Sequence, residues 1–233
     1  AFYAAYNRNT HLELPPARAF GDYIAWLQKQ DLAQAESFWR KSLNGFSTPN
    51  IFTTQPHTEK DATPGHERKR LSTDLTETLR LFARQHKLTL NTLVQGAWAI
   101  LSSRYSGDED VLFGATVSGR PPDLPGVESI VGLFINTLPV RVDTSSDWPL
   151  VEWLQQLQVQ QIEARQYDYS PLVSIQGWSD VPRQTPLFES LLVYENYPVD
   201  TSLEAPQTSF SITDVRSTEL TNYPLVLVAG AGA

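Results

Sequence analysis

The sequence predicts an α/β fold, with a mixed β-sheet flanked by helices. Segments whose apolar residues recur at helical spacing alternate with short apolar runs that are typical of buried strands. No linker or internal repeat separates them, so we expect a single domain over residues 1–233. The composition agrees, because 41% hydrophobic and 19% charged residues support a sizeable core and exclude a disordered chain.

Helical spacing in the first half of the chain predicts three helices. Residues 20–43 form one long amphipathic pattern, with a break expected near Gln30 and Asp31. A second helix is expected to start at Thr73, whose hydroxyl suits the N-cap. The third, over about residues 91–105, is apolar around most of its circumference and is therefore expected to be buried, with Gly107 as its stop.

The pattern after Gly107 predicts five strands and two helices. Residues 111–117 form a continuous apolar run bounded by turn formers, as in a buried strand, and residues 133–142 form a second strand. Residues 118–126 hold three prolines and two glycines, which excludes regular structure there. Further helices are expected at 148–165 and 171–176, and further strands at 187–194, 209–215 and 225–228.

Charge and composition exclude several function classes. The net charge is −8, and the second half of the chain is the acidic half, which argues against a nucleic-acid-binding protein. The chain has no cysteine, so disulfides, thiolate metal sites and a cysteine nucleophile are excluded. No apolar run reaches the roughly 20 residues of a membrane span, so we expect a soluble, cytoplasmic protein without a membrane partner.

No catalytic motif is visible along the chain. Phosphate-binding loops, the nucleophile elbow and the zinc-protease motif are absent, and no metal site is expected. The histidines are isolated and never fall at ligand spacing; they are His11, His57, His66 and His86. The residues themselves therefore nominate no catalytic group.

Polar residues inside apolar segments are the most unusual feature. Asn136 and Thr137 interrupt the second strand, and Arg141 follows them. Buried polar groups need hydrogen-bond partners, so these side chains either brace a loop or line a cavity. Asp22 and Tyr23 similarly allow a plain interpretation, as a carboxylate near a helix start and a core aromatic.

A set of short motifs follows in one order along the chain. The motifs are FGDYIAW at 20–26, FWR at 38–40 with Leu43, LSSRYSGDEDVLFG at 101–114, SGRPP at 118–122, VGLFINT at 131–137 with Arg141, SPL at 170–172, PLF at 186–188 and ENYP at 195–198. Together they resemble the condensation domains of nonribosomal peptide synthetases, of the type that joins two L-configured aminoacyl groups.

This resemblance implies a lobe of the chloramphenicol acetyltransferase-like fold. In that family two lobes enclose a tunnel, where donor and acceptor peptidyl carrier proteins present phosphopantetheine thioesters and an amide bond forms; an adenylation domain follows downstream. The family's HHxxxDG motif lies in the N-terminal lobe and is absent here. We therefore expect the C-terminal, acceptor-side lobe, inactive without its N-terminal lobe, with no catalytic residue and no directly bound cofactor.

The resemblance also assigns residues to places. It implies that residues 118–126 close the tunnel floor, and that Arg141 or Arg120 pairs with the aspartate of the missing motif. The residues expected to line the tunnel are Ser118, Gly119, Arg120, Gly132, Phe134, Asn136, Thr137 and Arg141; a structural motif comprises Asp22, Tyr23 and Trp26; carrier docking is expected at Arg68, Lys69 and Arg70. A bare wall at residues 134–137 is expected to promote association.

Two other functions stay open from the sequence. One is a docking or scaffold module that binds carrier proteins without catalysis. The other is an independent acyltransferase or esterase that uses one of the four histidines.

Overall fold

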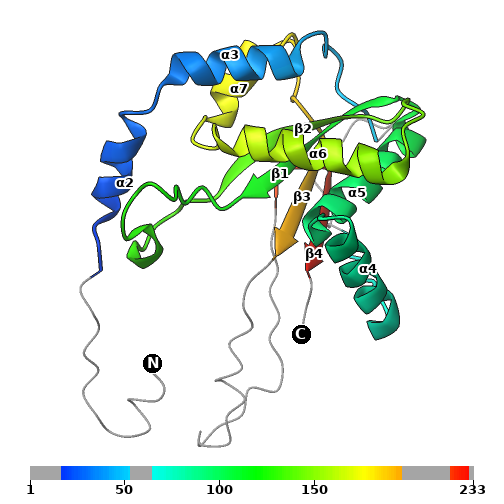
Figure 1. Ribbon diagram of the computed structural model, residues 1–233. Helices are drawn as coiled ribbons and strands as arrows, with labels where there is room; N and C mark the ends of the chain where they lie inside the picture. The colour runs from blue at the N-terminus through cyan, green and yellow to red at the C-terminus, as the bar shows by residue number, and fades with distance from the viewer. Residues whose placement is uncertain (1–16, 53–64, 196–220, 231–233) are drawn as a thin grey trace, which may run out of the picture.

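A four-stranded mixed sheet forms the centre of the computed structural model, which describes residues 17–52, 65–195 and 221–230 (Figure 1). The strand order is β2-β1-β3-β4. β1 is antiparallel to β2 and parallel to β3, and β3 is parallel to β4. The strands are β1 (Asp110–Val117), β2 (Asn136–Asp143), β3 (Ser190–Glu195) and β4 (Leu225–Gly230). The predicted α/β fold with a mixed sheet is confirmed; the strand expected at 209–215 lies outside the described residues.

The helices follow the predicted spacing, with one break. The amphipathic pattern over 20–43 forms two helices, and Asp31 is the N-cap of the second. Its carboxylate accepts hydrogen bonds from the backbone N–H groups of Ala33 and Gln34. The predicted break at this point is confirmed. The helices are α2 (Phe20–Leu27), α3 (Leu32–Leu43), α4 (Thr73–Gln85), α5 (Leu90–Ser106), α6 (Leu150–Arg165) and α7 (Leu172–Trp178), with a short 3₁₀ turn at Val127–Ser129. Among the described helices, none is long and apolar enough to cross a bilayer.

Local chemistry sets the other helix ends. Ser72, not Thr73, is the N-cap of α4, and its hydroxyl accepts a hydrogen bond from the backbone of Leu75. Thr89 caps α5 in the same way. Gly107 ends α5 in the left-handed conformation, with φ 81°, as its position predicts.

The two faces of the sheet are covered by different helices. α5 and α6 pack on the face that includes Phe113 and Val140, whereas α3 and α7 pack on the face that includes Leu112. Adjacent residues of one strand thus point to opposite faces, as strand geometry requires. Figure 1 shows α3 beside α7 and α6 running across β2.

Two expectations about burial and strand length are wrong. β2 begins at Asn136 rather than 133, because its last partner on β1 is Val117 and the preceding residues run past the end of that strand. α5 is not buried all round: Trp98 and Ala99 lie in the core, but Ile100, Leu101 and Tyr105 are exposed.

Gly119 makes the tightest backbone approach in the loop after β1. Its φ is 56°, and a Cβ atom at this position would overlap the carbonyl oxygen of Phe134. We expect Gly119→Ala to lower the free energy of unfolding by about 1–3 kcal/mol, through backbone strain and this overlap. Urea denaturation measures the change.

The matched control is Gly177→Ala, in α7. A Cβ atom there would meet nothing within 4 Å. Because glycine inside a helix costs backbone entropy, this variant is expected to gain about 0.5–1 kcal/mol. Equal losses in both variants would contradict the steric account.

Candidate functional site

Phe134 is the centre of an aromatic cluster that joins three motifs far apart in the sequence. Its ring centroid lies 4.5 Å from that of Tyr23 and 5.4 Å from that of Phe20, both in α2. Only 4% of Phe134 is exposed. The Phe134 cluster comprises Phe20, Tyr23, Trp26 and Leu27 of α2, Leu124, Val127 and Ile130 of the loop between β1 and β2, and Phe134 itself.

Arg120 fixes the loop that lies under this cluster. Its guanidinium carbon stands 4.0 Å from the centroid of the Phe134 ring. Its Nη1 donates hydrogen bonds to the carbonyl oxygens of Val127 (2.5 Å) and Ile130 (3.2 Å). The arginine thus ties residues 120–130 to the segment before β2, partly by a cation–π contact.

Glycine at position 132 is needed for α2 to approach. A Cβ atom on Gly132 would overlap the ring of Phe20. Gly119 thus lies against the backbone of Phe134 and Gly132 against the ring of Phe20, whereas Ser118 is exposed. The sequence placed these residues in one site, and the structure brings Gly119, Arg120, Gly132 and Phe134 together.

Alternate side chains of the segment before β2 face outward. Phe134 is buried, contrary to the expected bare wall at this residue. Val131 is 81% exposed, Leu133 76% and Ile135 58%, so these three form the exposed apolar row. Of the expected wall at 134–137, only Ile135 is exposed and Phe134 is buried, so that expectation is wrong at its aromatic residue. The exposed row lies mainly before the expected range, because the extended backbone points alternate residues to opposite sides.

Asn136 braces a loop, which decides between the two readings of this residue. Its Nδ2 donates to the carbonyl oxygens of Asp168 (2.7 Å) and Ser170 (2.8 Å), and its Oδ1 accepts from the backbone of Thr137. Ser170 is fully buried, and its hydroxyl accepts a hydrogen bond from Trp39 Nε1 at 3.1 Å. The SPL motif is thus held between β2 and α3.

Arg141 occupies a different place, near the far end of β2. Its guanidinium forms a two-point ion pair with Asp110 on β1, and Nη1 donates to the carbonyl oxygens of Ser42 and Asn44. The hydrogen bond that Arg141 donates to Asp110 raises the pKa of Arg141, against the opposing effect of burial. Seven residues of extended chain separate it from Phe134, about 23 Å, so the two predicted lining residues do not meet.

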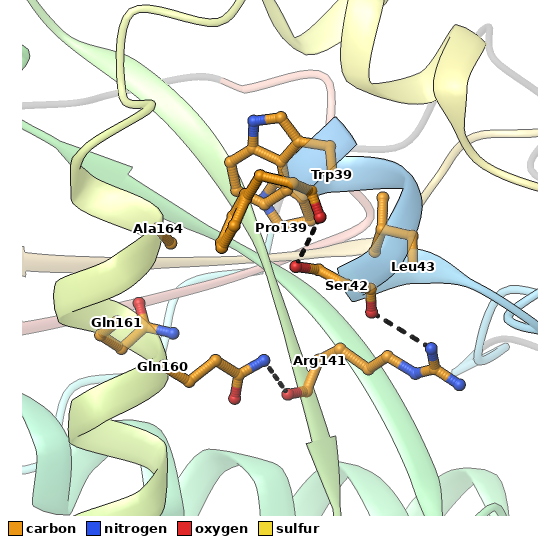
Figure 2. A pocket seen from close by; sticks show the side chains of 9 residues that line it. Trp39, Ser42, Leu43, Pro139, Arg141, Gln160, Gln161 and Ala164 are labelled. Atoms are coloured by element: carbon orange, nitrogen blue, oxygen red, sulfur yellow. Dashed lines mark hydrogen bonds between the residues drawn. The ribbon is translucent and has the colours of Figure 1, made fainter. Parts of the chain in front are cut away.

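The pocket beside Arg141 is too small for a substrate. Figure 2 shows it between α3, β2 and α6, lined by residues that include Trp39, Ser42 and Gln160. Its volume is about 10 Å³, which is room for about one water molecule. Gln160 Nε2 donates to the carbonyl oxygen of Arg141, so α6 pairs with the outer edge of the sheet.

The motif residues of α2 are held by polar contacts at its surface. Asp22 pairs with Arg18 at 2.6 Å, and Trp26 Nε1 donates to Asp123 at 3.1 Å. Burial, and then the charge of Asp168, raises the pKa of Tyr23. Tyr23 is thus a core aromatic residue, as one interpretation of the sequence predicted. Trp26 links α2 to the loop at residues 118–126 through Asp123.

Two polar residues of structural importance were missed by sequence reasoning. Asn50 is buried; its Nδ2 donates to the carbonyl oxygen of Asp110, and its Oδ1 accepts from the backbone of Leu112 at 2.7 Å. The side chain of Asn50 thereby makes the backbone hydrogen bonds that a neighbouring strand would make at the start of β1. Asp168 is half-buried, and burial raises the pKa of its carboxyl, while Arg165 lowers it and Asp123 raises it.

The remaining predicted residues lie away from the Phe134 cluster. Arg68, Lys69 and Arg70 are exposed just before α4, so their docking role stays a prediction. His86 packs against Phe82, with ring centroids 4.6 Å apart, and His66 is exposed. His11 and His57 lie outside the described residues. Within the described ranges, no group of three potential metal ligands occurs.

Comparisons with known proteins agree on one family. The family model described as "Condensation domain" matches residues 1–231. Linear gramicidin synthase subunits D and C of Brevibacillus parabrevis are each 52% identical, over 100% and 91% of this chain. The chain spans only 5% and 3% of those two relatives.

A solved structure shares the fold. The first condensation domain of the CDA synthetase superposes with a TM-score of 0.68 at 14% identity, over 85% of this chain and 44% of that one. The predicted chloramphenicol acetyltransferase-like fold is thereby confirmed.

The ion pair between Arg141 and Asp110 should stabilise the fold more than an exposed pair does. Because 24% and 44% of these side chains are exposed, solvent screens the pair partly, and we expect a coupling energy of about 1 kcal/mol. A double-mutant cycle with Arg141→Gln and Asp110→Asn measures it. The control cycle uses Arg80 and Glu77 on α4, for which about 0.3–0.5 kcal/mol is expected. A coupling no larger than the control would contradict this role.

Asp168 predicts a pH dependence of stability. A carboxyl whose folded pKa is raised binds its proton more tightly in the folded state, so its contribution to stability is lost as pH rises from the unfolded pKa through the folded pKa. Asp168→Asn should therefore be more stable than the parent at about pH 7, with the gain disappearing at about pH 3. Denaturant midpoints at both pH values test this.

The control for this variant is Asp147→Asn, at an exposed position. Asp147→Asn should leave the denaturant midpoint nearly unchanged at both pH values. A gain from Asp168→Asn that is equal at both pH values would show that removal of the charge is not its cause.

Proposed function

The chain belongs to the condensation-domain family of nonribosomal peptide synthetases, and on that premise we propose that it is the C-terminal, acceptor-side lobe of such a domain. The complete domain joins a carrier-bound aminoacyl or peptidyl thioester to the amine of a carrier-bound aminoacyl acceptor. The observation that carries the proposal is the Phe134 cluster, in which the family-like motifs of α2, the 118–126 loop and the 131–137 segment meet.

The chemistry needs a base that the described part of the chain does not place near the cluster. The acceptor nitrogen attacks the thioester carbonyl, the C–N bond forms, the C–S bond breaks, and the thiolate leaves on the donor arm. The nitrogen must lose a proton during the reaction, which calls for a base within hydrogen-bond reach. Among the described residues, neither His66 nor His86 belongs to the Phe134 cluster. We infer that the base is the second histidine of HHxxxDG, in the N-terminal lobe.

The role of this chain is then to form one wall and the floor of the tunnel. Arg120 and Asn136 hold the floor loop and the wall segment rigidly, which is what positioning of two substrates requires. The exposed row of Val131, Leu133 and Ile135 supplies apolar surface on that wall. The pocket beside Arg141, at about 10 Å³, is too small for a phosphopantetheine arm. In the proposal, the N-terminal lobe therefore completes the tunnel that holds the two arms.

Arg120 is the better partner for the aspartate of the missing motif. Arg141 already engages Asp110 through Nε and Nη2, and two backbone carbonyls through Nη1. Arg120 uses Nη1 alone in the described contacts and is only half-buried. Its remaining N–H groups are available to a carboxylate across the lobe interface.

The proposal extends to partners and to the groups they carry. Two peptidyl carrier proteins present their phosphopantetheine arms from opposite ends of the tunnel, and an adenylation domain loads the acceptor carrier. The exposed basic residues Arg68, Lys69 and Arg70 are candidates for contact with a carrier. No cofactor is bound directly by this lobe in the proposed reaction.

Reconstitution tests the proposal. The chain is mixed with a separately produced N-terminal lobe that contains HHxxxDG and with loaded donor and acceptor carriers, and dipeptidyl product is measured by mass spectrometry. We expect product from the mixture, and at least about tenfold less with Arg120→Gln, since a charged pair across the interface is lost. Arg183→Gln, at an exposed position, is the control and should leave the yield unchanged.

Two results would count against the proposal. Lack of product from the folded, mixed lobes would remove the amide-forming role. Full yield from Arg120→Gln would keep that role but exclude Arg120 as the interface partner.

A further inference from the structure

The two edges of the sheet differ in how their backbone groups are covered. β2 and β4 are the edge strands, and β4 lies beside β3 on the side away from β2 (Figure 1). An edge strand presents a row of N–H and C=O groups that can pair with another strand. Natural proteins normally cover this row, or interrupt it with proline or a charged side chain. An edge that lacks such protection is the place where a further strand fits.

The outer edge of β2 is protected by its own proline and by side chains of α6. Pro139 has no N–H group to offer to another strand. The carbonyl oxygen of Arg141 accepts a hydrogen bond from Gln160 Nε2, and that of Asp143 accepts one from Trp153 Nε1. These contacts take the place of bonds that an added strand would make, so β2 is closed to further pairing.

The outer edge of β4 has no such protection among the described residues. The N–H group of Leu225 donates to the carbonyl oxygen of Glu189 at 3.4 Å, so it points toward β3. Along a strand in a parallel pair, the backbone groups of alternate residues point to the two sides. The N–H and C=O groups of Val226, Val228 and Gly230 therefore point away from β3.

The segment that contains β4 is also free of charged residues. Residues 221–230 include no Asp, Glu, Lys or Arg, whereas the whole chain carries a net charge of −8. Its exposed side chains are apolar, because Leu225 is 39% exposed and Val228 51%. Two copies of an acidic chain repel each other in general, but they do not repel where both present this segment.

We propose that the outer edge of β4 pairs with β4 of a second copy of the chain, antiparallel and about a twofold axis at Val228. The backbone groups fix an extended strand as the occupant, and the absence of charge and the exposed apolar side chains make the strand complementary to itself. The pairing joins two four-stranded sheets into one continuous sheet. The proposal does not rest on the proposed function.

The alternation of backbone groups fixes the register of this pairing. Val228 lies opposite its counterpart in the second copy, and Val226 lies opposite Gly230. Glu195 pairs with Gly230 at the end of the β3–β4 ladder. Because the two β4 strands run in opposite directions, the two Glu195 carboxylates lie at opposite ends of the paired strands and do not repel each other closely.

Sedimentation velocity of the full chain over a range of concentrations tests the proposal. We expect a reversible dimer. Val228→Lys places two lysines directly opposite each other and should raise the dissociation constant of the dimer at least about tenfold. An equal mixture of Val228→Lys and Val228→Glu should restore the dimer, because opposite charges then face each other. A variant that fails to fold gives no such restoration, and circular dichroism identifies it.

The matched control is Val159→Lys on α6, where the valine is 48% exposed. It should leave the dissociation constant unchanged. The proposal is overturned by a chain that stays monomeric, by a dimer that Val228→Lys leaves intact, by equal loss in Val159→Lys, or by folded Val228→Lys and Val228→Glu chains that do not pair. A dimer that Leu133→Ser abolishes and Val228→Lys does not would overturn it and assign association to the exposed apolar row before β2.

Discussion

Burial of the Phe134 ring is the constraint on which the candidate site depends. The ring enters between α2 and the loop after β1, and Arg120 covers it with its guanidinium. To place it there, the backbone must leave the sheet before Asn136, which shortens β2 at its start. The same turn exposes Val131, Leu133 and Ile135 on the other side. One buried aromatic side chain thus shapes both the loop after β1 and the segment before β2.

Polar side chains stabilise this arrangement where regular secondary structure does not. Asn136, Arg120 and Asn50 each satisfy backbone groups of an irregular segment, and each would cost free energy if its partners were lost. Arg141 and Asp110 do the same at the far end of β2. The polar residues inside the apolar segments are therefore mainly structural supports.

Features set by neighbouring residues could be predicted from the sequence, and features set by distant contacts could not. Asp31 and Gly107 act through their own helix ends, so the break and the stop were foreseen. The role of Asn136 depends on Asp168 and Ser170, more than thirty positions away, and the sequence left two readings open. The inward side of Phe134 was misjudged because a strand was extended through it. α5 was expected to be buried because composition does not tell which side of a helix lacks a neighbour.

The central claim is that this chain forms a wall of the reaction tunnel without supplying the base. The most direct test is single-turnover amide formation with this chain and the two loaded carriers, without an N-terminal lobe. The account predicts no more dipeptidyl product than the carriers give by themselves. Product clearly above that background, abolished by unfolding of the chain, would contradict it.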